Sequence, residues 1–187
     1  MSGIFVAVVG PSGVGKDTLL DGARRALLAD PAFRFVQRSI TRPSDAAGED
    51  HIAVSQDAFD DAEAKGAFAL TWRAHGLAYG VPADILTDLA NGKTIIANLS
   101  RTALDEAHAL GYTSLIVSVR ASSEVLRARL KARGRENDEE IEARVERASA
   151  FNVSGDDVVE LWNDTTPDAA IETFLELIRS KRLKAQA

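Results

Sequence analysis

A glycine-rich segment near the amino terminus has the residue types and spacing needed to bind nucleotide phosphates. Residues 10–16 read Gly-Pro-Ser-Gly-Val-Gly-Lys, which fits the phosphate-loop pattern G-x-x-x-x-G-K. In such a loop the backbone N–H groups turn inward around phosphate oxygens, and the following helix N-terminus adds partial positive charge. The Lys16 ammonium would reach the β- and γ-phosphates, so we expect phosphoryl transfer rather than a glycine turn without a ligand. The residues expected to hold the donor phosphates are Gly10, Pro11, Ser12, Gly13, Val14, Gly15, Lys16, Asp17 and Thr18.

The residue after the lysine departs from the usual pattern. Asp17 stands where Ser or Thr normally offers a hydroxyl to Mg²⁺, and Thr18 follows one place later. A carboxylate is also a hard oxygen ligand for Mg²⁺, which makes Asp17 the candidate metal-binding residue. The alternative interpretation is that Asp17 only favours the positive end of the helix dipole.

A second candidate segment is rich in arginine. Residues 127–135 hold five positive charges and no acid. Arg129 and Arg133 are four residues apart on one helix face, and Arg144 lies on the next predicted helix. We expect this helical pair to close over the nucleotide, with Arg129, Arg133 and Arg144 stabilising charge on the transferred phosphoryl group beside Lys16. The alternative is an ordinary solvated surface.

These groups need a scaffold, and alternating strand and helix patterns predict an α/β fold with a mostly parallel sheet. The continuous apolar run Ile4–Val9 predicts a buried strand directly before the loop, and a helix follows it. Ser122 is the expected cap of one later helix, and Asn137 with Glu140 resembles a capping box opening the next. Further strands are expected over 33–40, 68–73, 94–99, 115–120 and 158–162, helices over 57–65, 82–91 and 168–184, and a loop over 76–82.

Composition narrows the function classes. The 187 residues predict one domain, and 22 basic against 28 acidic residues give a net charge of −6, which argues against a nucleic-acid binder. Cysteine is absent, so disulfides and thiolate chemistry are excluded. Without a signal-like or membrane-spanning apolar run, we expect a cytoplasmic protein that does not enter membranes. The charge is unevenly placed, because residues 34–42 carry +3 and residues 127–135 carry +5.

The motifs resemble those of guanylate kinases. The resemblance rests on the loop at 10–16, Thr41-Arg42-Pro43, Gly48-Glu49, Tyr79-Gly80 and the arginine-rich pair of helices, in that order along most of the chain. It implies a phosphate-loop NTPase-type three-layer fold in a single kinase domain. The core would comprise residues 1–33, 84–126 and 148–187, with an acceptor-binding insertion at 34–83 and a lid at 127–147.

Departures from the guanylate kinase pattern concern the acceptor. Thr71 and Val81 stand where those enzymes typically read guanine, and the second phosphate-binding arginine falls near Asp45 or Ala46. A site without its polar readers loses discrimination by orders of magnitude, so GMP is not the expected acceptor. The blocks Gly15-Lys16-Asp17, Glu49-Asp50-His51, Asn98-Leu99-Ser100-Arg101 and Arg133-Gly134-Arg135-Glu136-Asn137 look like those of the ribose 1,5-bisphosphate phosphokinases. That resemblance implies phosphonate breakdown by the carbon–phosphorus lyase route, with ATP and Mg²⁺ as cofactors and 5-phosphoribosyl 1-diphosphate and ADP as products.

A sugar bisphosphate needs bidentate donors and hydroxyl readers instead of a base slot. The candidate acceptor-binding residues are Arg38, Arg42, Glu49, His51, His75, Tyr79, Asn98 and Arg101. The arginines have surface charge as their alternative role, the histidines structural hydrogen bonding, and Tyr79 aromatic packing. Trp72 and Trp162 are expected in the core, and His108 is expected to be structural.

Two other functions stay open at this stage. One is a guanylate kinase or another small-molecule or nucleoside monophosphate kinase. The other is a guanylate-kinase-like binding module without catalysis, although such modules generally lack the loop lysine or the lid arginines, and this sequence has both. The partners expected are small molecules, ATP and ribose 1,5-bisphosphate, and the sequence leaves monomer and homodimer open.

Overall fold

The computed structural model describes residues 3–43 and 50–186, and its centre is a five-stranded parallel sheet. The strands lie in the order β2 (Phe33–Phe35), β7 (Thr94–Asn98), β1 (Ile4–Val9), β8 (Thr113–Arg120) and β9 (Val158–Trp162). All four neighbouring pairs are parallel. After β1 the chain forms the edge strand β2, then β7 between β2 and β1, and then crosses to the other side of β1 for β8 and β9, which creates a switch point between β1 and β8. Ligands of such sheets bind at the carboxyl ends of the strands near that point.

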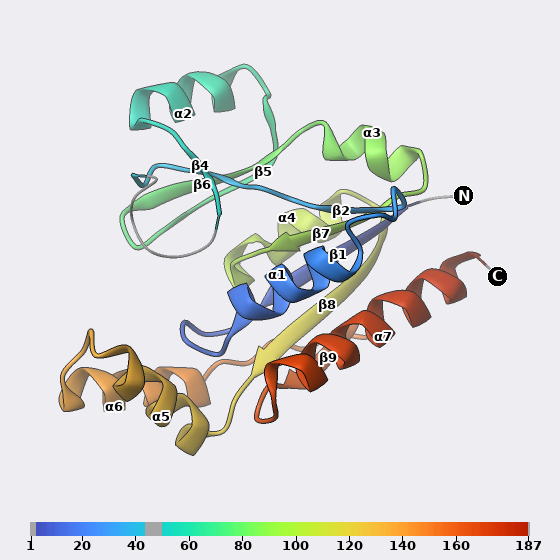
Figure 1. Cartoon of the computed structure of the whole chain (residues 1–187). Coiled ribbons are helices and arrows are strands. Elements are labelled where there is room, and N and C mark those ends of the chain that lie inside the picture. Colours follow the sequence, from blue (N-terminus) through green and yellow to red (C-terminus); the bar gives the residue numbers. More distant parts are fainter. Residues whose placement is uncertain (1–2, 44–49, 187) are drawn as a thin grey trace.

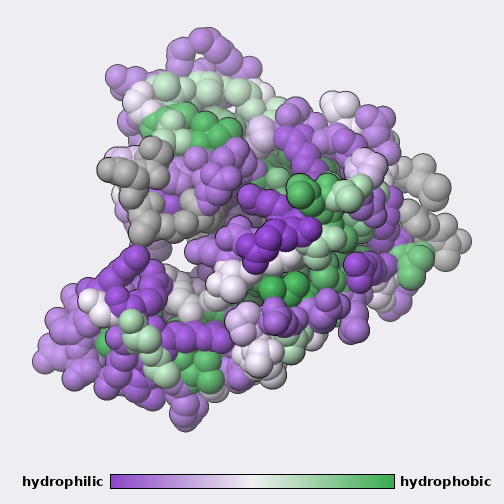
Figure 2. All heavy atoms as spheres, viewed as in Figure 1, coloured by the Kyte–Doolittle hydropathy of each residue, from purple (hydrophilic) through white to green (hydrophobic). Residues whose placement is uncertain are grey.

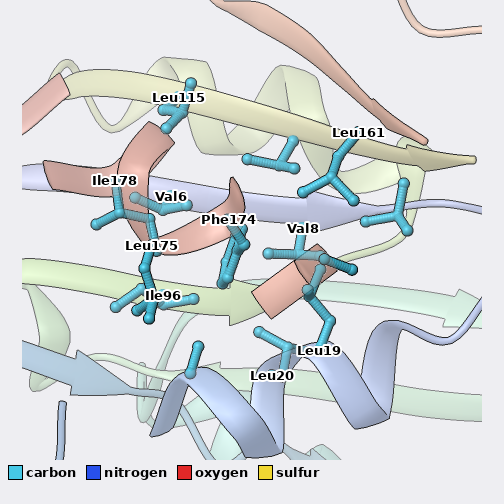
Figure 3. Close-up of a cluster of buried hydrophobic side chains, with 14 of the residues drawn as sticks. Val6, Val8, Leu19, Leu20, Ile96, Leu115, Leu161, Phe174, Leu175 and Ile178 are labelled. Carbon is cyan, nitrogen blue, oxygen red and sulfur yellow. The ribbon is translucent and has the colours of Figure 1, made fainter. Parts of the chain in front are cut away.

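Two helices cover one face of this sheet. They are α1 (Lys16–Ala26) and α7 (Pro167–Gln186), which pack on each other and on the strands. Figure 3 shows the core between them, where Val6 and Val8 of β1 meet Leu19 of α1 and Phe174 of α7. Because β1 is buried on both faces, every residue of Ile4–Val9 is apolar, as the sequence pattern indicates.

The opposite face of the sheet is covered by α3 (Ile85–Ala90), the 3₁₀ turn Arg101–Ala103 and α4 (Leu104–Ala109). Phe5, Ile95 and Ile116 form this second core with Ile85 and Leu89 of α3. The helix expected over 82–91 therefore begins three residues later, because Pro82 still belongs to a strand.

A second, smaller sheet packs against this second core, in the order β4 (Ile52–Ala53), β3 (Ser39–Ile40), β6 (Leu77–Pro82) and β5 (Phe68–Ala74), with α2 (Gln56–Ala64) beside it. One strand prediction and one loop prediction are wrong here. The run 33–40 is split between the two sheets, because β2 pairs with β7 whereas β3 pairs with β4 and β6. Most of the loop expected over 76–82 is a strand, because residues 77–82 pair antiparallel with β5 as the second arm of a hairpin.

The arginine-rich segment forms a helix pair, α5 (Ser123–Arg133) and α6 (Asp138–Ser149). Both sequence-predicted caps are confirmed: Ser122 accepts from the Val125 N–H, and Asn137 forms a full capping box with Glu140. The pair has its own small core, Leu126, Leu130, Ile141 and Val145. This separate core holds α5 and α6 together as one unit.

The helix pair and the smaller sheet project from the same side of the molecule, with the loop before α1 between them (Figure 1). The space-filling view shows that side hollowed between the two projections, with hydrophilic residues along the hollow (Figure 2). Among the described helices, none is long and apolar enough to cross a membrane.

An ion-pair network joins the two ends of the segment that carries the smaller sheet. Arg34 of β2 donates to Asp88 of α3 at 2.6 Å and to Asp84 at 2.8 Å, and Lys93 lies 2.7 Å from the other Asp88 oxygen. Hydrogen bonds from Lys93 and Arg34 lower the pKa of Asp88 below its ordinary value. The network thus fixes both chain crossings between the core and the smaller sheet.

We expect Asp88→Asn to destabilise the protein by about 1–2 kcal/mol at pH 7, because the amide cannot pair with two cations. A carboxylate whose native pKa is lowered stabilises the fold above its unfolded pKa of about 3.9, and this stability is lost as pH falls through the native value. The deficit of the variant should therefore shrink at about pH 3. Urea unfolding at both pH values measures it, and an equal deficit at both would assign the effect to packing instead of charge.

Candidate active site

A cavity of about 720 Å³ opens where the phosphate loop, the smaller sheet and the helix pair meet. The loop and the start of α1 form one wall, the ends of β7 and β9 the floor, and α5 and the β5–β6 hairpin the remaining walls. Its lining includes Gly10, Ser12, Gly13, Gly15, Lys16, Asp17, Thr18, Arg38, Arg42, Trp72, His75, Tyr79, Asn98, Ser100, Arg129, Arg133 and Asn163. The two basic segments of an acidic chain therefore face one space.

The phosphate loop follows β1 at the switch point of the sheet. The Lys16 ammonium donates to the carbonyls of Gly10 at 2.7 Å and Pro11 at 2.9 Å, which places it over the mouth of the loop. Gly15 has a φ of +94°, and a Cβ there would collide with the side-chain amide of Asn163. Both the backbone conformation and this close neighbour require glycine at position 15.

Asn163 is a site residue that sequence analysis missed. It follows β9, is 5% exposed, and donates from Nδ2 to the Val14 carbonyl at 2.7 Å. Arg129 of α5 donates to the same carbonyl at 3.3 Å. Two elements far apart in the chain thus hold one carbonyl of the phosphate loop. The signal available in the sequence was the place of Asn163 at the carboxyl end of a predicted parallel strand.

On the opposite wall, Arg38 lies against a stacked aromatic pair. Trp72 and Tyr79 are cross-strand partners on β5 and β6, with ring centroids 5.2 Å apart and planes 2° from parallel. The Arg38 guanidinium carbon lies 5.3 Å and 5.2 Å from the two centroids, and the residue is 7% exposed. Contact with ring faces holds a planar guanidinium in one orientation while keeping its charge.

Arg42 is held beside Arg38 by a histidine. His51 Nδ1 lies 3.3 Å from Arg42 Nη2, and His51 Nε2 lies 3.1 Å from the Arg42 carbonyl oxygen. The buried Nε of Arg42 has no hydrogen-bond acceptor among the residues that the structure describes. A buried donor without an acceptor is costly, so a residue that lines the cavity in this way is suited to receive an anion.

The helix pair brings its arginines to the phosphate loop. Arg129 and Arg133 line the cavity, and Arg144 donates to the Ser12 hydroxyl at 3.3 Å. Glu136 lies 3.1 Å from Arg144 and fixes its other nitrogen. Lys16, Arg129 and Arg133 therefore line one space, and Arg144 contacts the phosphate loop beside it. Positive charges in this arrangement can oppose the charge of a polyphosphate.

Comparison with known proteins agrees with this geometry, since residues 3–179 match the guanylate kinase family. The chain belongs to the guanylate kinase family. A protein of Brucella melitensis named ribose 1,5-bisphosphate phosphokinase PhnN is 43% identical over 99% of this chain and 96% of its own. One of the same name from Acidiphilium cryptum is 48% identical over 95% and 93%. The guanylate kinase of Anaplasma phagocytophilum shares the fold, with a TM-score of 0.67 at 16% identity over 97% and 87% of the chains.

Thr71 and Val81 stand at the two positions where guanylate kinases typically read guanine, and neither residue lines the cavity. Val81 is fully buried in the second core. The Thr71 hydroxyl bonds to Glu63 of α2, and with Arg73 it lowers the pKa of that carboxyl to about 2, the Arg73 hydrogen bond being the larger cause. Val81 therefore packs in the second core, whereas Thr71 links the smaller sheet to its helix.

Two of the candidate acceptor-binding residues, Arg101 and His51, do not line the cavity. Arg101 does not line the cavity, because its guanidinium lies over the Phe151 ring at 5.4 Å. His51 also lies outside the lining, and Glu49 lies outside the described residues. His75 does line the cavity, from the hairpin tip, where it has a φ of +53°, a conformation uncommon for a non-glycine residue.

Of the two tryptophans expected in the core, the structure buries one. Trp72 is buried as expected, although it also lines the cavity. The prediction for Trp162 is wrong, because it lies 52% exposed on the edge strand with Arg120 over its ring. His108 binds Asp157 at 3.0 Å, far along the chain, in keeping with a structural role.

A carboxylate and a side-chain amide at this site offer oxygen ligands suited to a metal ion. Asp17 and Asn98 both line the cavity, at the start of α1 and the end of β7. The described residues contain no group of three or more histidine or acidic side chains that could hold a metal alone. This donor set fits Mg²⁺, which is usually held by one or two protein oxygens together with substrate phosphates.

Proposed function

We propose that this protein transfers the γ-phosphoryl group of ATP to the 1-phosphate of ribose 1,5-bisphosphate, giving 5-phosphoribosyl 1-diphosphate and ADP. As a member of a kinase family it is a phosphotransferase that uses a nucleotide. The observation that carries the acceptor assignment is the cavity wall opposite the phosphate loop. It presents Arg38, Arg42 and His75, and neither guanine-reading position reaches it. The names of the relatives at 43% and 48% identity support the same acceptor.

The reaction needs little acid–base chemistry from the protein. The attacking atom is an oxygen of a sugar phosphate, whose second pKa near 6 leaves it ionised at neutral pH. This oxygen forms a bond to the γ-phosphorus while the bond from that phosphorus to the β–γ bridging oxygen breaks, and ADP leaves with the electron pair. The contributions of the chain are positioning and charge neutralisation. Lys16 with Arg129, Arg133 and Arg144 would follow the donor charge, and Arg38 and Arg42 would hold the acceptor.

Mg²⁺, when bound, would neutralise part of the charge on the donor phosphates. Asp17 and Asn98, which line the cavity, would hold it directly or through water. Closure of the helix pair would exclude water, which matters because a half-closed site would hydrolyse ATP.

The test is detection of 5-phosphoribosyl 1-diphosphate from ATP and ribose 1,5-bisphosphate, with GMP and ribose 5-phosphate as separate acceptors. We expect product only with the bisphosphate, because ribose 5-phosphate lacks the accepting group and GMP meets no base readers. Turnover of GMP at an equal or greater kcat/KM would contradict the acceptor assignment. Binding of ATP without transfer to any of the three would contradict the enzyme itself.

A further inference from the structure

His51 is separated from the cavity by the residue it holds. It is 8% exposed, immediately precedes β4, and contacts Arg42 through both ring nitrogens. The preceding residue, Thr41, is held by Ala78 of β6. The Thr41 N–H donates to the Ala78 carbonyl at 3.1 Å, and the Ala78 N–H donates to the Thr41 hydroxyl at 2.8 Å. The backbone at Arg42 is therefore clamped between β6 and His51.

The chemistry of the two contacts fixes the form of the ring. The Arg42 carbonyl oxygen can only accept, so His51 Nε2 must carry the proton and donate to it. The Arg42 guanidinium can only donate, so His51 Nδ1 must present its lone pair. Both bonds exist together only in the neutral tautomer with hydrogen on Nε2. The other neutral tautomer would lose both bonds, and the protonated ring would set an N–H against an N–H.

We propose that His51 is a positioning residue for acceptor binding, acting through Arg42 by holding both its carbonyl and its guanidinium. One guanidinium nitrogen is bound to the ring, so the side chain is held and the buried Nε keeps its direction. An arginine ordered before the ligand arrives loses less rotamer freedom on binding, which strengthens its hold on an anion. The effect on catalysis rests on the proposed function, whereas the tautomer does not.

The kinetic test compares His51→Phe, His51→Gln and the control His108→Gln, which alters an exposed histidine bonded to Asp157. We expect His51→Phe to raise KM for ribose 1,5-bisphosphate about 10-fold to 100-fold, with KM for ATP and kcat within about twofold. His51→Gln should recover most of this loss, because its amide can donate to the carbonyl and accept from the guanidinium. His108→Gln should behave as the wild type. An unchanged acceptor KM in His51→Phe would overturn the proposal.

A double-mutant cycle separates action through Arg42 from direct contact with the acceptor. In an Arg42→Ala background, His51→Phe should add nothing further to KM, because the proposal has His51 act on the acceptor through Arg42. A further increase of the size seen in the wild-type background would mean that the imidazole touches the acceptor itself, and would overturn the proposal.

The tautomer is read without any substrate, from the imidazole ¹⁵N resonances of a protein that has three histidines. His51, assigned by its loss in His51→Gln, should show a protonated Nε2 and an unprotonated Nδ1, a preference that weakens in Arg42→Ala. The opposite tautomer would overturn the proposal whatever the acceptor is. If the wild type forms no product from the bisphosphate while this tautomer is observed, the proposed function fails and the clamp stands.

Discussion

Replacing Lys16 by Ala should lower kcat about 10³-fold or more while the fold survives. Among the residues that the structure describes, Lys16 is the one lysine that lines the cavity. In the proposed mechanism its ammonium follows charge onto the β–γ bridge as the phosphoryl group leaves. A 10³-fold loss corresponds to about 4 kcal/mol of transition-state stabilisation, within the range of a charge that acts in a water-excluded site. Steady-state and single-turnover rates with ATP and ribose 1,5-bisphosphate measure it.

The folding cost of this substitution should be small. Lys16 donates to the carbonyls of Gly10 and Pro11, two partly exposed residues at which water can replace the ammonium, so we expect a change of about 1 kcal/mol or less. Lys65→Ala is the matched control, because that lysine pairs with Asp61 on the exposed surface of α2. A Lys16→Ala protein that is folded and turns over within about tenfold of the wild type would remove Lys16 from the mechanism.

What sequence could predict here was local. The phosphate loop, the Ser122 cap and the capping box at Asn137 are each written within a few residues, and the structure has all three in place. The same holds for β1, whose unbroken apolar run indicates burial on both faces.

What sequence missed depends on pairing between distant segments. Residues 77–82 contain Gly80 and Pro82, which disfavour strands, yet they pair with β5 because the His75-Gly76 turn closes a hairpin. The break between β2 and β3 has no local signal, since it reflects which sheet each half joins. Asn163 reaches Val14 across 149 residues, a contact that only the folded sheet creates.

Distant contacts also decide which of the candidate acceptor-binding side chains reach the cavity. Arg101 was expected at the site from its place after β7, and the edge is correct, but the side chain turns to Phe151. His51 was a candidate for acceptor binding with structural hydrogen bonding as its alternative role, and the structure shows it hydrogen-bonded to Arg42. The sequence places residues at an edge of the sheet, and the packing decides which side of that edge each side chain faces.

Replacing Arg129 by Ala should lower kcat about 10²-fold to 10³-fold, the second largest effect we expect. Arg129 lines the cavity from α5 and reaches the phosphate loop, donating to the Val14 carbonyl at 3.3 Å. A guanidinium at this place would oppose the charge that develops on the equatorial oxygens during transfer. The loop itself should keep its shape, because Asn163 still donates to the same carbonyl at 2.7 Å. The loss should therefore appear in kcat with little change in KM for ATP.

The chain offers a matched control on the same helix. Arg127 is two residues away and points outward, where it forms two hydrogen bonds with Glu142 of α6, at 2.5 Å and 2.8 Å. Arg127→Ala makes the same substitution on the same helix as Arg129→Ala and removes the same charge. It breaks only an exposed ion pair, so its kcat should stay within about twofold of the wild type. Arg129→Lys should recover part of the rate, because it keeps the charge without the planar fork.

The two variants together separate a specific arginine from a generally basic surface. If the net positive charge of residues 127–135 were what mattered, Arg127→Ala and Arg129→Ala would lose activity equally, and the loss would fall steeply with added salt because exposed charges are screened. A guanidinium acting inside the closed cavity is screened much less, so the Arg129→Ala deficit should persist at high salt. Equal losses in the two variants, or a deficit that salt abolishes, would show that the helix pair attracts the nucleotide without taking part in the transfer.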